Sequence, residues 1–343
     1  MSRVLCAVLA LVFCACAGLG VRPEEIPEGE IALRWYDEEA TRRRRDAVDD
    51  LTRQAQGSGQ GSGVAVARVD DVSRYMGQLL GVSTGIDPRA LDRRFPGRLA
   101  FFEPHAGTIS LVPGARPGAN PSDLSADGDR LLFSQLDGKY RQLYQYLRST
   151  GEIRRVTRGP HVHADGCYGP DGSVIMLRAT VEGSQARSRI VMTRSRGERP
   201  LLVSEGPSNW GPACAPDGNA IAWVSVDRKR GDQLMTKVPP LDGPVRRLGP
   251  GKDPSFSRDS EWIVYSARVG KVWQLFRIRP DGSGRHPMGR NTLDSIQPAF
   301  SPDGELVVYV SDDGFDRRPY LRRFDGTGDT ILLHEGSGIN PIW

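Results

Sequence analysis

The chain lacks the short motifs that mark several common enzyme classes. Its 343 residues contain no phosphate-binding Walker loop and no His-Glu-x-x-His zinc motif. Histidine and cysteine are both rare, with five residues of each. We therefore expect no catalytic residues and no cofactor. Catalytic groups that converge from distant strands nevertheless leave no motif, so a hydrolase or lyase stays an alternative.

An excess of one charge is also missing. Lys and Arg total 46 and Asp and Glu total 42, which leaves a net charge of +4 at neutral pH. Nucleic-acid-binding domains usually gather basic residues on one face. The balanced charge therefore predicts no nucleic-acid partner, and 40 Gly with 25 Pro predict a turn-rich fold.

A membrane-spanning run is absent as well, because the apolar stretch from Val4 to Phe13 is too short to cross a bilayer as a helix. It has the pattern of an export signal. We predict a lipoprotein-type signal peptide over residues 1–15, with Cys16 as the lipidated residue. Ordinary cleavage beside Ala15-Cys16-Ala17 is the alternative.

Residues 16–96 form a tether and helical region before the repeats begin. The sequence predicts a strand over Ile31–Tyr36 and a helix over Glu38–Gln54. Gly57–Gly63 has the Gly/Ser composition of a flexible linker. An apolar stripe at helical spacing predicts a second helix between Asp70 and Gly81.

One phrase recurs through the rest of the chain. Gln297–Gly304 ends in Ser-Pro-Asp-Gly and precedes the apolar run Leu306–Val310, which predicts a strand, a turn and a second strand. Related phrases recur every 42 to 46 residues. The large residue before each turn is Leu124, Tyr168, Cys214, Phe256, Phe300 and finally Trp343. This period, with about four strands in each unit, predicts a β-propeller.

A second repeated position, after each turn, agrees with the position before it. Five residues after each turn Gly, or after Ser260 in its place, lies a large apolar residue that we expect in the core: Phe133, Leu177, Trp223, Tyr265 and Tyr309. The strand with Pro341 and Trp343 would be the inner strand of a sixth blade, paired with the segment 98–112. The fold class is thus all-β, a six-bladed propeller over residues 97–343 closed by N- and C-terminal strands, without open edges.

Few side chains suggest a metal site. His161, His163 and Asp165 would share one face of an extended strand, which makes them weak metal candidates. Polar residues on a rim are the alternative. The turn carboxylates recur once in each of five blades, and a structural role in the turn is favoured over calcium binding or catalysis. They are Asp127, Asp171, Asp217, Asp259 and Asp303.

Two cysteines remain after the signal and the lipidation site. Cys167 and Cys214 fall on the inner strands of consecutive blades, one residue apart in register. That offset places their side chains on opposite strand faces unless a strand carries a bulge. A disulfide and two buried thiols therefore both stay open.

The phrase Pro-x-Phe-Ser-Pro-Asp-Gly followed by an apolar-aromatic strand, best kept at 298–309 and 212–223, resembles the repeat of TolB-type propellers. The resemblance covers residues 97–343. It implies a six-bladed periplasmic protein that binds an envelope protein or peptide at one mouth of the ring and does not turn over substrate. We expect a monomer within a larger complex, anchored to the outer membrane through Cys16. Glycan binding by Trp210 or Trp273 is a further alternative.

Overall fold

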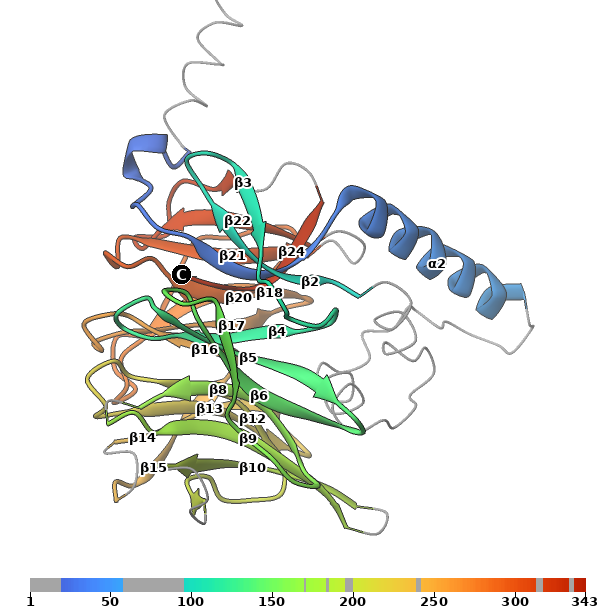
Figure 1. Ribbon diagram of the computed structural model, residues 1–343. Coiled ribbons are helices and arrows are strands. Elements are labelled where there is room, and N and C mark those ends of the chain that lie inside the picture. Colours follow the sequence, from blue (N-terminus) through green and yellow to red (C-terminus); the bar gives the residue numbers. More distant parts are fainter. Residues whose placement is uncertain are drawn as a thin grey trace, which may run out of the picture.

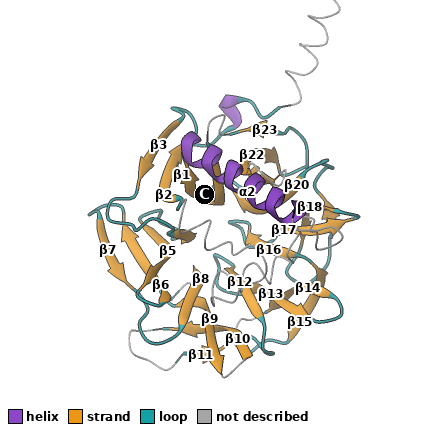
Figure 2. Cartoon of the chain, turned by 90° about the vertical axis from the view of Figure 1, so that its right-hand side faces the viewer, coloured by secondary structure: helices purple, strands orange, loops and turns teal. Residues whose placement is uncertain are grey.

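The computed structural model describes residues 20–57, 96–169, 171–182, 185–194, 200–238, 242–312, 317–332 and 336–343. The signal peptide, Cys16, nearly all of the Gly/Ser linker and the helix predicted between Asp70 and Gly81 lie outside these residues. Six four-stranded sheets surround a central axis, as Figure 2 shows. The predicted six-bladed β-propeller is confirmed.

Blades 1 to 3 are antiparallel sheets whose strands follow one another in the chain, the first being innermost. Blade 1 contains β4 (Asn120–Leu124), β5 (Arg130–Asp137), β6 (Tyr140–Leu147) and β7 (Glu152–Arg155). Blade 2 contains β8 (Val162–Tyr168), β9 (Val174–Glu182), β10 (Gln185–Thr193) and β11 (Leu201–Leu202). Blade 3 contains β12 (Asn209–Cys214), β13 (Ile221–Asp227), β14 (Gly231–Lys237) and β15 (Val245–Pro250).

Blades 4 and 5 repeat this order, whereas blade 6 joins the two ends of the chain. Blade 4 contains β16 (Lys252–Phe256), β17 (Ile263–Val269), β18 (Val272–Ile278) and β19 (His286–Pro287). Blade 5 contains β20 (Asp294–Phe300), β21 (Leu306–Asp312), β22 (Arg317–Arg323) and β23 (Thr330–Ile331). Blade 6 contains β24 (Ser337–Ile342), β1 (Ile31–Tyr36), β2 (Arg98–Glu103) and β3 (Thr108–Leu111).

The pairing of the C-terminal strand differs from the sequence prediction. β24 pairs with β1, through Ala32 and Ile342, and β2 pairs with the other edge of β1. The expectation that β24 pairs directly with the segment 98–112 is therefore wrong. The propeller includes Ile31–Tyr36, a strand that a boundary at residue 97 leaves out.

The repeated turns have the backbone that the sequence implies. Gly304 has φ +79°, in the left-handed region that glycine enters at little cost. Ser260 replaces glycine in the fourth turn and keeps φ +63°. The strand after each turn then carries one of the five predicted core residues, and none of these is more than 1% exposed.

The hydrophobic core consists of six clusters, one at each junction between neighbouring blades. Blade 1 packs on blade 2 through Leu132, Leu143 and Met176. Blade 6 packs on blade 1 through Phe101 and Phe133. Because each sheet is covered on both faces, the blade walls are committed to packing, and recognition is left to the two mouths of the ring.

A helix and a short N-terminal segment flank this ring. The predicted helix is confirmed as α2 (Glu38–Gly57), which directly follows β1 and projects from one mouth (Figure 1). The 3₁₀ turn η1 (Pro23–Glu25) lies against blade 5, where Glu25 pairs with Arg323 at 2.7 Å. No helix in the described ranges is long and apolar enough to span a membrane.

Cys167 and Cys214 form a disulfide between blades 2 and 3, with Cα atoms 5.6 Å apart. Both inner strands carry a register shift, between Ala164 and Gly166 in β8 and between Trp210 and Ala213 in β12. These irregularities bring together side chains that regular strands would place on opposite faces. The question that the sequence left open is resolved in favour of the bridge.

Candidate functional site

The two mouths of the ring are built from different connections. The turns that join each inner strand to the second strand lie at one end, which we name the turn mouth. The hairpins between second and third strands lie at the other end, together with α2, and we name this end the helix mouth (Figures 1 and 2). Each mouth therefore gathers loops from all the blades.

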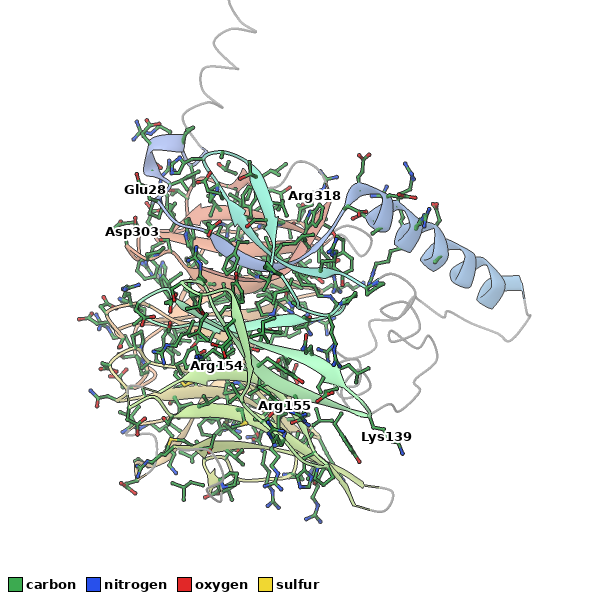
Figure 3. All side chains as sticks on the ribbon, viewed as in Figure 1. Glu28, Lys139, Arg154, Arg155, Asp303 and Arg318 are labelled. Carbon is green, nitrogen blue, oxygen red and sulfur yellow. A yellow bond between two sulfur atoms is a disulfide. The ribbon has the colours of Figure 1, made fainter. Side chains whose placement is uncertain are left out.

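The connections at the two mouths differ in charge. The turns between inner and second strands at the turn mouth carry eight acidic residues and a single basic one, Arg258. These acidic residues are Asp127, Asp129, Asp171, Asp217, Asp259, Glu261, Asp303 and Glu305. The described connections between third and fourth strands at the same end add four basic residues, Arg148, Arg194, Arg279 and Arg285, and four acidic ones, Asp242, Asp281, Asp325 and Asp329. The described hairpins of the helix mouth are richer in cations, among them Lys139, Arg228, Lys229, Arg230 and Lys271. Figure 3 shows Lys139 and Arg318 on the α2 side, opposite Glu28 and Asp303.

The helix mouth also exposes apolar side chains. Among the described residues, seven large hydrophobic side chains are exposed, and four of them lie at this end: Leu136, Tyr140, Val269 and Leu293. Val269 and Leu136 are 54% and 53% exposed. Apolar groups beside cations at a mouth are suited to contacts with another polypeptide.

The candidate metal ligands do not share one face. His161 and His163 are close, with ring centroids 6.3 Å apart. Asp165 falls at the register shift of β8, with φ +40°, and this breaks the alternation on which the prediction depended. No group of three His, Cys, Asp or Glu side chains arranged for a metal ion occurs within the described ranges.

The environments of these three side chains differ. Burial, followed by the positive charge of Arg178, lowers the pKa of His163 to about 4. The same two causes lower the pKa of the less buried His161. Burial raises the pKa of Asp165 to about 7, with a smaller contribution from Asp253. His163 is also fixed in place, since its Nδ1 lies 3.2 Å from Oε1 of Gln142.

A set of basic residues that the sequence did not reveal surrounds these histidines. His163 pairs with Arg178 across β8 and β9, and Arg178 pairs with Arg189 across β9 and β10. Met176 lies two residues from Arg178 in β9, and Val191 lies two residues from Arg189 in β10, so each shares a strand face with its arginine. Met176 and Val191 pack against blade 1. The row therefore faces blade 1 near the helix mouth. A neighbouring row on the same face contains His161 and Arg187. We name the two rows together the basic rows: His161, His163, Arg178, Arg187 and Arg189.

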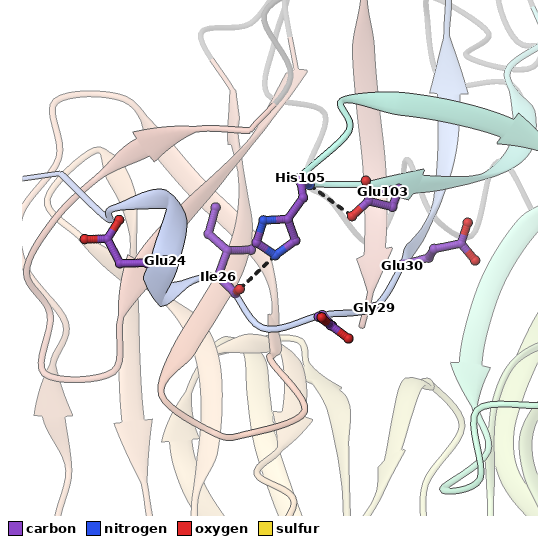
Figure 4. Close-up of a pocket in the computed structure, with 7 residues that line it drawn as sticks. Glu24, Ile26, Gly29, Glu30, Glu103 and His105 are labelled. Carbon is purple, nitrogen blue, oxygen red and sulfur yellow. Dashed lines mark hydrogen bonds between the residues drawn. The ribbon is translucent and has the colours of Figure 1, made fainter.

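An open pocket of about 640 Å³ lies at the turn mouth of blade 6 (Figure 4). Four glutamates line it: Glu24, Glu28, Glu30 and Glu103. His105, which had no suggestive sequence neighbours, also lines the pocket, and its Nε2 lies 3.0 Å from the carbonyl oxygen of Ile26. Glu103 accepts a hydrogen bond from the backbone N–H of His105 at 3.0 Å. Both side chains thus hold the backbone of this corner.

The turn carboxylates bond to their own turns. Asp303 accepts hydrogen bonds from Oγ of Ser301 at 2.5 Å and from the backbone N–H of Glu305 at 3.0 Å. Asp259 does the same with Ser257, at 2.5 Å, and this bond is the main cause of its lowered pKa. These contacts support the structural interpretation of the five aspartates.

Catalytic geometry has little support in the described residues. Hydrogen bonds link the ring nitrogens of His105 and His163 to a backbone carbonyl and to Gln142, neither of which is a nucleophile. A Gly-x-Ser-x-Gly string occurs in the sequence, Gly81–Gly85, and lies outside the described residues.

Neither of the two tryptophans considered for glycan binding is fully exposed. Trp210 is buried, 6% exposed, in the junction between blades 2 and 3. Trp273 is half-buried, and the ammonium of Lys252 lies 4.4 Å from its ring centroid. Trp210 is therefore closed to a sugar, and Lys252 occupies one face of Trp273.

Comparison with known sequences gives distant relatives. No protein-family model matches the chain. An uncharacterized protein of Agrobacterium fabrum is 29% identical over 239 residues, 64% of this chain and 78% of that protein. A TolB homolog of Chlorobium luteolum is 28% identical over 101 residues, and an uncharacterized peptidase of Bacillus subtilis is 26% identical over 168 residues. These two matches cover 29% and 48% of this chain, and only 23% and 24% of the relatives.

Solved structures agree on the fold. TolB from Acinetobacter baumannii superposes with a TM-score of 0.62 at 20% identity, over 72% of this chain and 62% of that one. A putative TolB from Agrobacterium tumefaciens superposes with a TM-score of 0.58 at 23% identity, over 69% and 89%. In fold, the chain is a six-bladed propeller of the TolB type.

Proposed function

We propose that this protein is a non-catalytic binding scaffold of the bacterial cell envelope that holds a protein or peptide segment at its helix mouth. The observation that carries the proposal is the difference between the two mouths. The turn carboxylates bond within their own turns, whereas the helix mouth presents cations and four exposed apolar side chains. Such a mixture suits a polypeptide partner better than a small neutral substrate.

The disulfide supports an exported protein. Disulfides such as Cys167–Cys214 persist in oxidising compartments, of which the bacterial periplasm is one. Lipidation of Cys16 would then anchor the ring to the outer membrane. Labelling cells with a palmitate analogue tests this part, since the label should enter the protein and be lost in Cys16→Ser.

Cross-linking in native envelopes, followed by affinity capture and mass spectrometry, tests the scaffold. The helix-mouth variant Lys139→Glu, Arg230→Glu and Lys271→Glu changes three exposed hairpin cations. The control variant Arg154→Glu, Arg194→Glu and Arg246→Glu changes the net charge equally, but at exposed residues of the outer strands and the turn-mouth side. We expect a stoichiometric envelope protein that the control retains and the helix-mouth variant loses. Equal capture by both variants, or no partner at all, contradicts the proposal.

A hydrolase or lyase is the alternative, and the peptidase relative is its main support. The experiment that separates the two is turnover of envelope peptides by purified protein. Activity that disappears in Ser83→Ala while the melting temperature stays constant would favour the enzyme.

A further inference from the structure

We propose that the basic rows bind the carboxylates of an acidic segment in the partner protein, an inference that rests on the proposed function and names the chemistry of its partner. Arg178 and Arg189 are directly paired across β9 and β10. Like charges in this arrangement destabilise a sheet, because the Cβ atoms lie only about 5 Å apart. An anion between them turns the repulsion into attraction.

Arg178 has unused donor capacity. Its Nε is buried and has no hydrogen-bond acceptor in the part of the chain that the structure describes. A buried donor without a partner costs free energy that a bound acceptor recovers. A guanidinium also presents paired N–H groups with the spacing of the two oxygens of a carboxylate. An oxyanion beside this half-buried guanidinium would supply an acceptor.

Among the described residues, no carboxylate forms an ion pair with Arg178 or Arg189. Arg141 of β6 donates to the carbonyl oxygens of Ser134 and Gly118. Asp137, at the end of β5, is already bound by Arg155 at 2.5 Å and by the hydroxyl of Tyr144 at 3.1 Å. Burial is the main cause of the lowered pKa of both histidines, and the positive charge of Arg178 is the second.

The opposite wall explains why a peptide fits better than free phosphate. Leu136 lies on the face of β5 that carries Leu132 into the junction with blade 2, and it is 53% exposed. An apolar side chain opposite a row of guanidinium groups matches a segment in which acidic and apolar residues alternate. Inorganic phosphate would leave Leu136 in contact with water.

Histidine NMR tests the site directly, because the chain has only five histidines. The probe is the end-blocked peptide Glu-Leu-Glu-Leu-Glu, with Gln-Leu-Gln-Leu-Gln and inorganic phosphate as comparisons. The acidic peptide should move the ring signals of His161 and His163 and leave exposed His286 unchanged. Arg178→Gln should weaken this binding by about tenfold or more, as expected for the loss of a charge-assisted bond. The matched control Arg154→Gln, on outer strand β7, should bind as the wild type does.

Three results would overturn the inference: no movement of the two signals with the acidic peptide, equal affinity in Arg178→Gln, or binding of phosphate but not of the peptide. Capture of the native partner separates this inference from the scaffold proposal. If Arg178→Gln captures the partner as well as the wild type does, the scaffold stands and the acidic-segment inference fails. If neither protein captures a partner, the scaffold proposal itself fails.

Discussion

The side chain of Gln297 accepts a hydrogen bond from the backbone N–H of Asn340, with Oε1 and N 2.9 Å apart. The same relationship occurs one blade earlier, where Oδ2 of Asp253 accepts from the N–H of Gln297 at 3.3 Å. All three residues adopt positive φ, of 54°, 54° and 52°. They lie at equivalent bulges of consecutive inner strands. The C-terminal strand is thus held by blade 5 as well as by β1.

Removal of Asn340–Trp343 should therefore destabilise the whole ring. The deletion takes away the bond to Gln297, the pairing of Ile342 with Ala32 and the partly buried Trp343 in the junction between blades 5 and 6. Loss of a large aromatic side chain from a core costs about 3 to 5 kcal/mol. Urea unfolding measures the change, with Leu201→Ala on exposed β11 as a control that should change little. An unchanged midpoint in the deletion variant would contradict this account of ring closure.

The disulfide should contribute a similar amount. Cys167 and Cys214 are 47 residues apart, and closing a loop of that length stabilises the folded chain by about 4 kcal/mol in the chain-entropy model. The double variant Cys167→Ser, Cys214→Ser should lose most of this free energy of unfolding. Dithiothreitol should lower the melting temperature of the wild type and leave the variant unaffected. Two free thiols in untreated, denatured protein would show that the bridge is absent.

Most of the ring was predictable because local chemistry repeats. Each Pro-Asp-Gly turn marks the end of an inner strand, and the residue five positions later, such as Trp223 or Tyr309, is buried as expected. The strand Ile31–Tyr36 was predicted, but its place as the second strand of blade 6 was not. No such turn precedes β1, and more than 60 residues separate it from β2. Neither the repeated residue before a turn nor the core residue after it could therefore identify β1 as part of a blade.

The candidate site was largely invisible for a related reason. The sequence drew attention to His161 and His163, which are close in the chain, but Arg178 and Arg189 meet only through strand pairing. The one available signal is the hairpin itself. Glu182 pairs with Gln185 across a two-residue connection, and counting outward from that pair places Arg178 opposite Arg189. The bulge that turns Asp165 away has no comparable signal.

The turn aspartates can be tested for a structural role in the turn against a role in calcium binding. Asp303→Ala removes the acceptor for Oγ of Ser301 and for the N–H of Glu305, so stability should fall by about 1 kcal/mol. Captured partner should stay at the wild-type level, because the turn lies at the mouth opposite the proposed site. A chelator should leave the melting temperature of the wild type unchanged. A fall in melting temperature on chelation would support calcium binding at these turns.

Asp123 should make stability depend on pH in the direction opposite to most carboxylates. Its Oδ2 accepts the backbone N–H of Tyr168 at 2.8 Å, between inner strands β4 and β8, and burial raises its pKa to about 7. A carboxyl whose pKa is higher in the folded than in the unfolded protein favours folding when protonated. Its contribution is complete below about pH 4 and is lost as the pH rises through 7.

Asp123→Asn keeps an oxygen acceptor for Tyr168 and removes the titration. The variant should therefore gain about 4 kcal/mol over the wild type between pH 4 and pH 8. Asp259→Asn provides the control of opposite sign, because the bond from Ser257 lowers the pKa of Asp259, so that its contribution is lost as the pH falls. That variant should lose stability at pH 8 and little at pH 3. Parallel pH profiles for the two variants would contradict both assignments, since burial dominates at Asp123 and hydrogen bonding at Asp259.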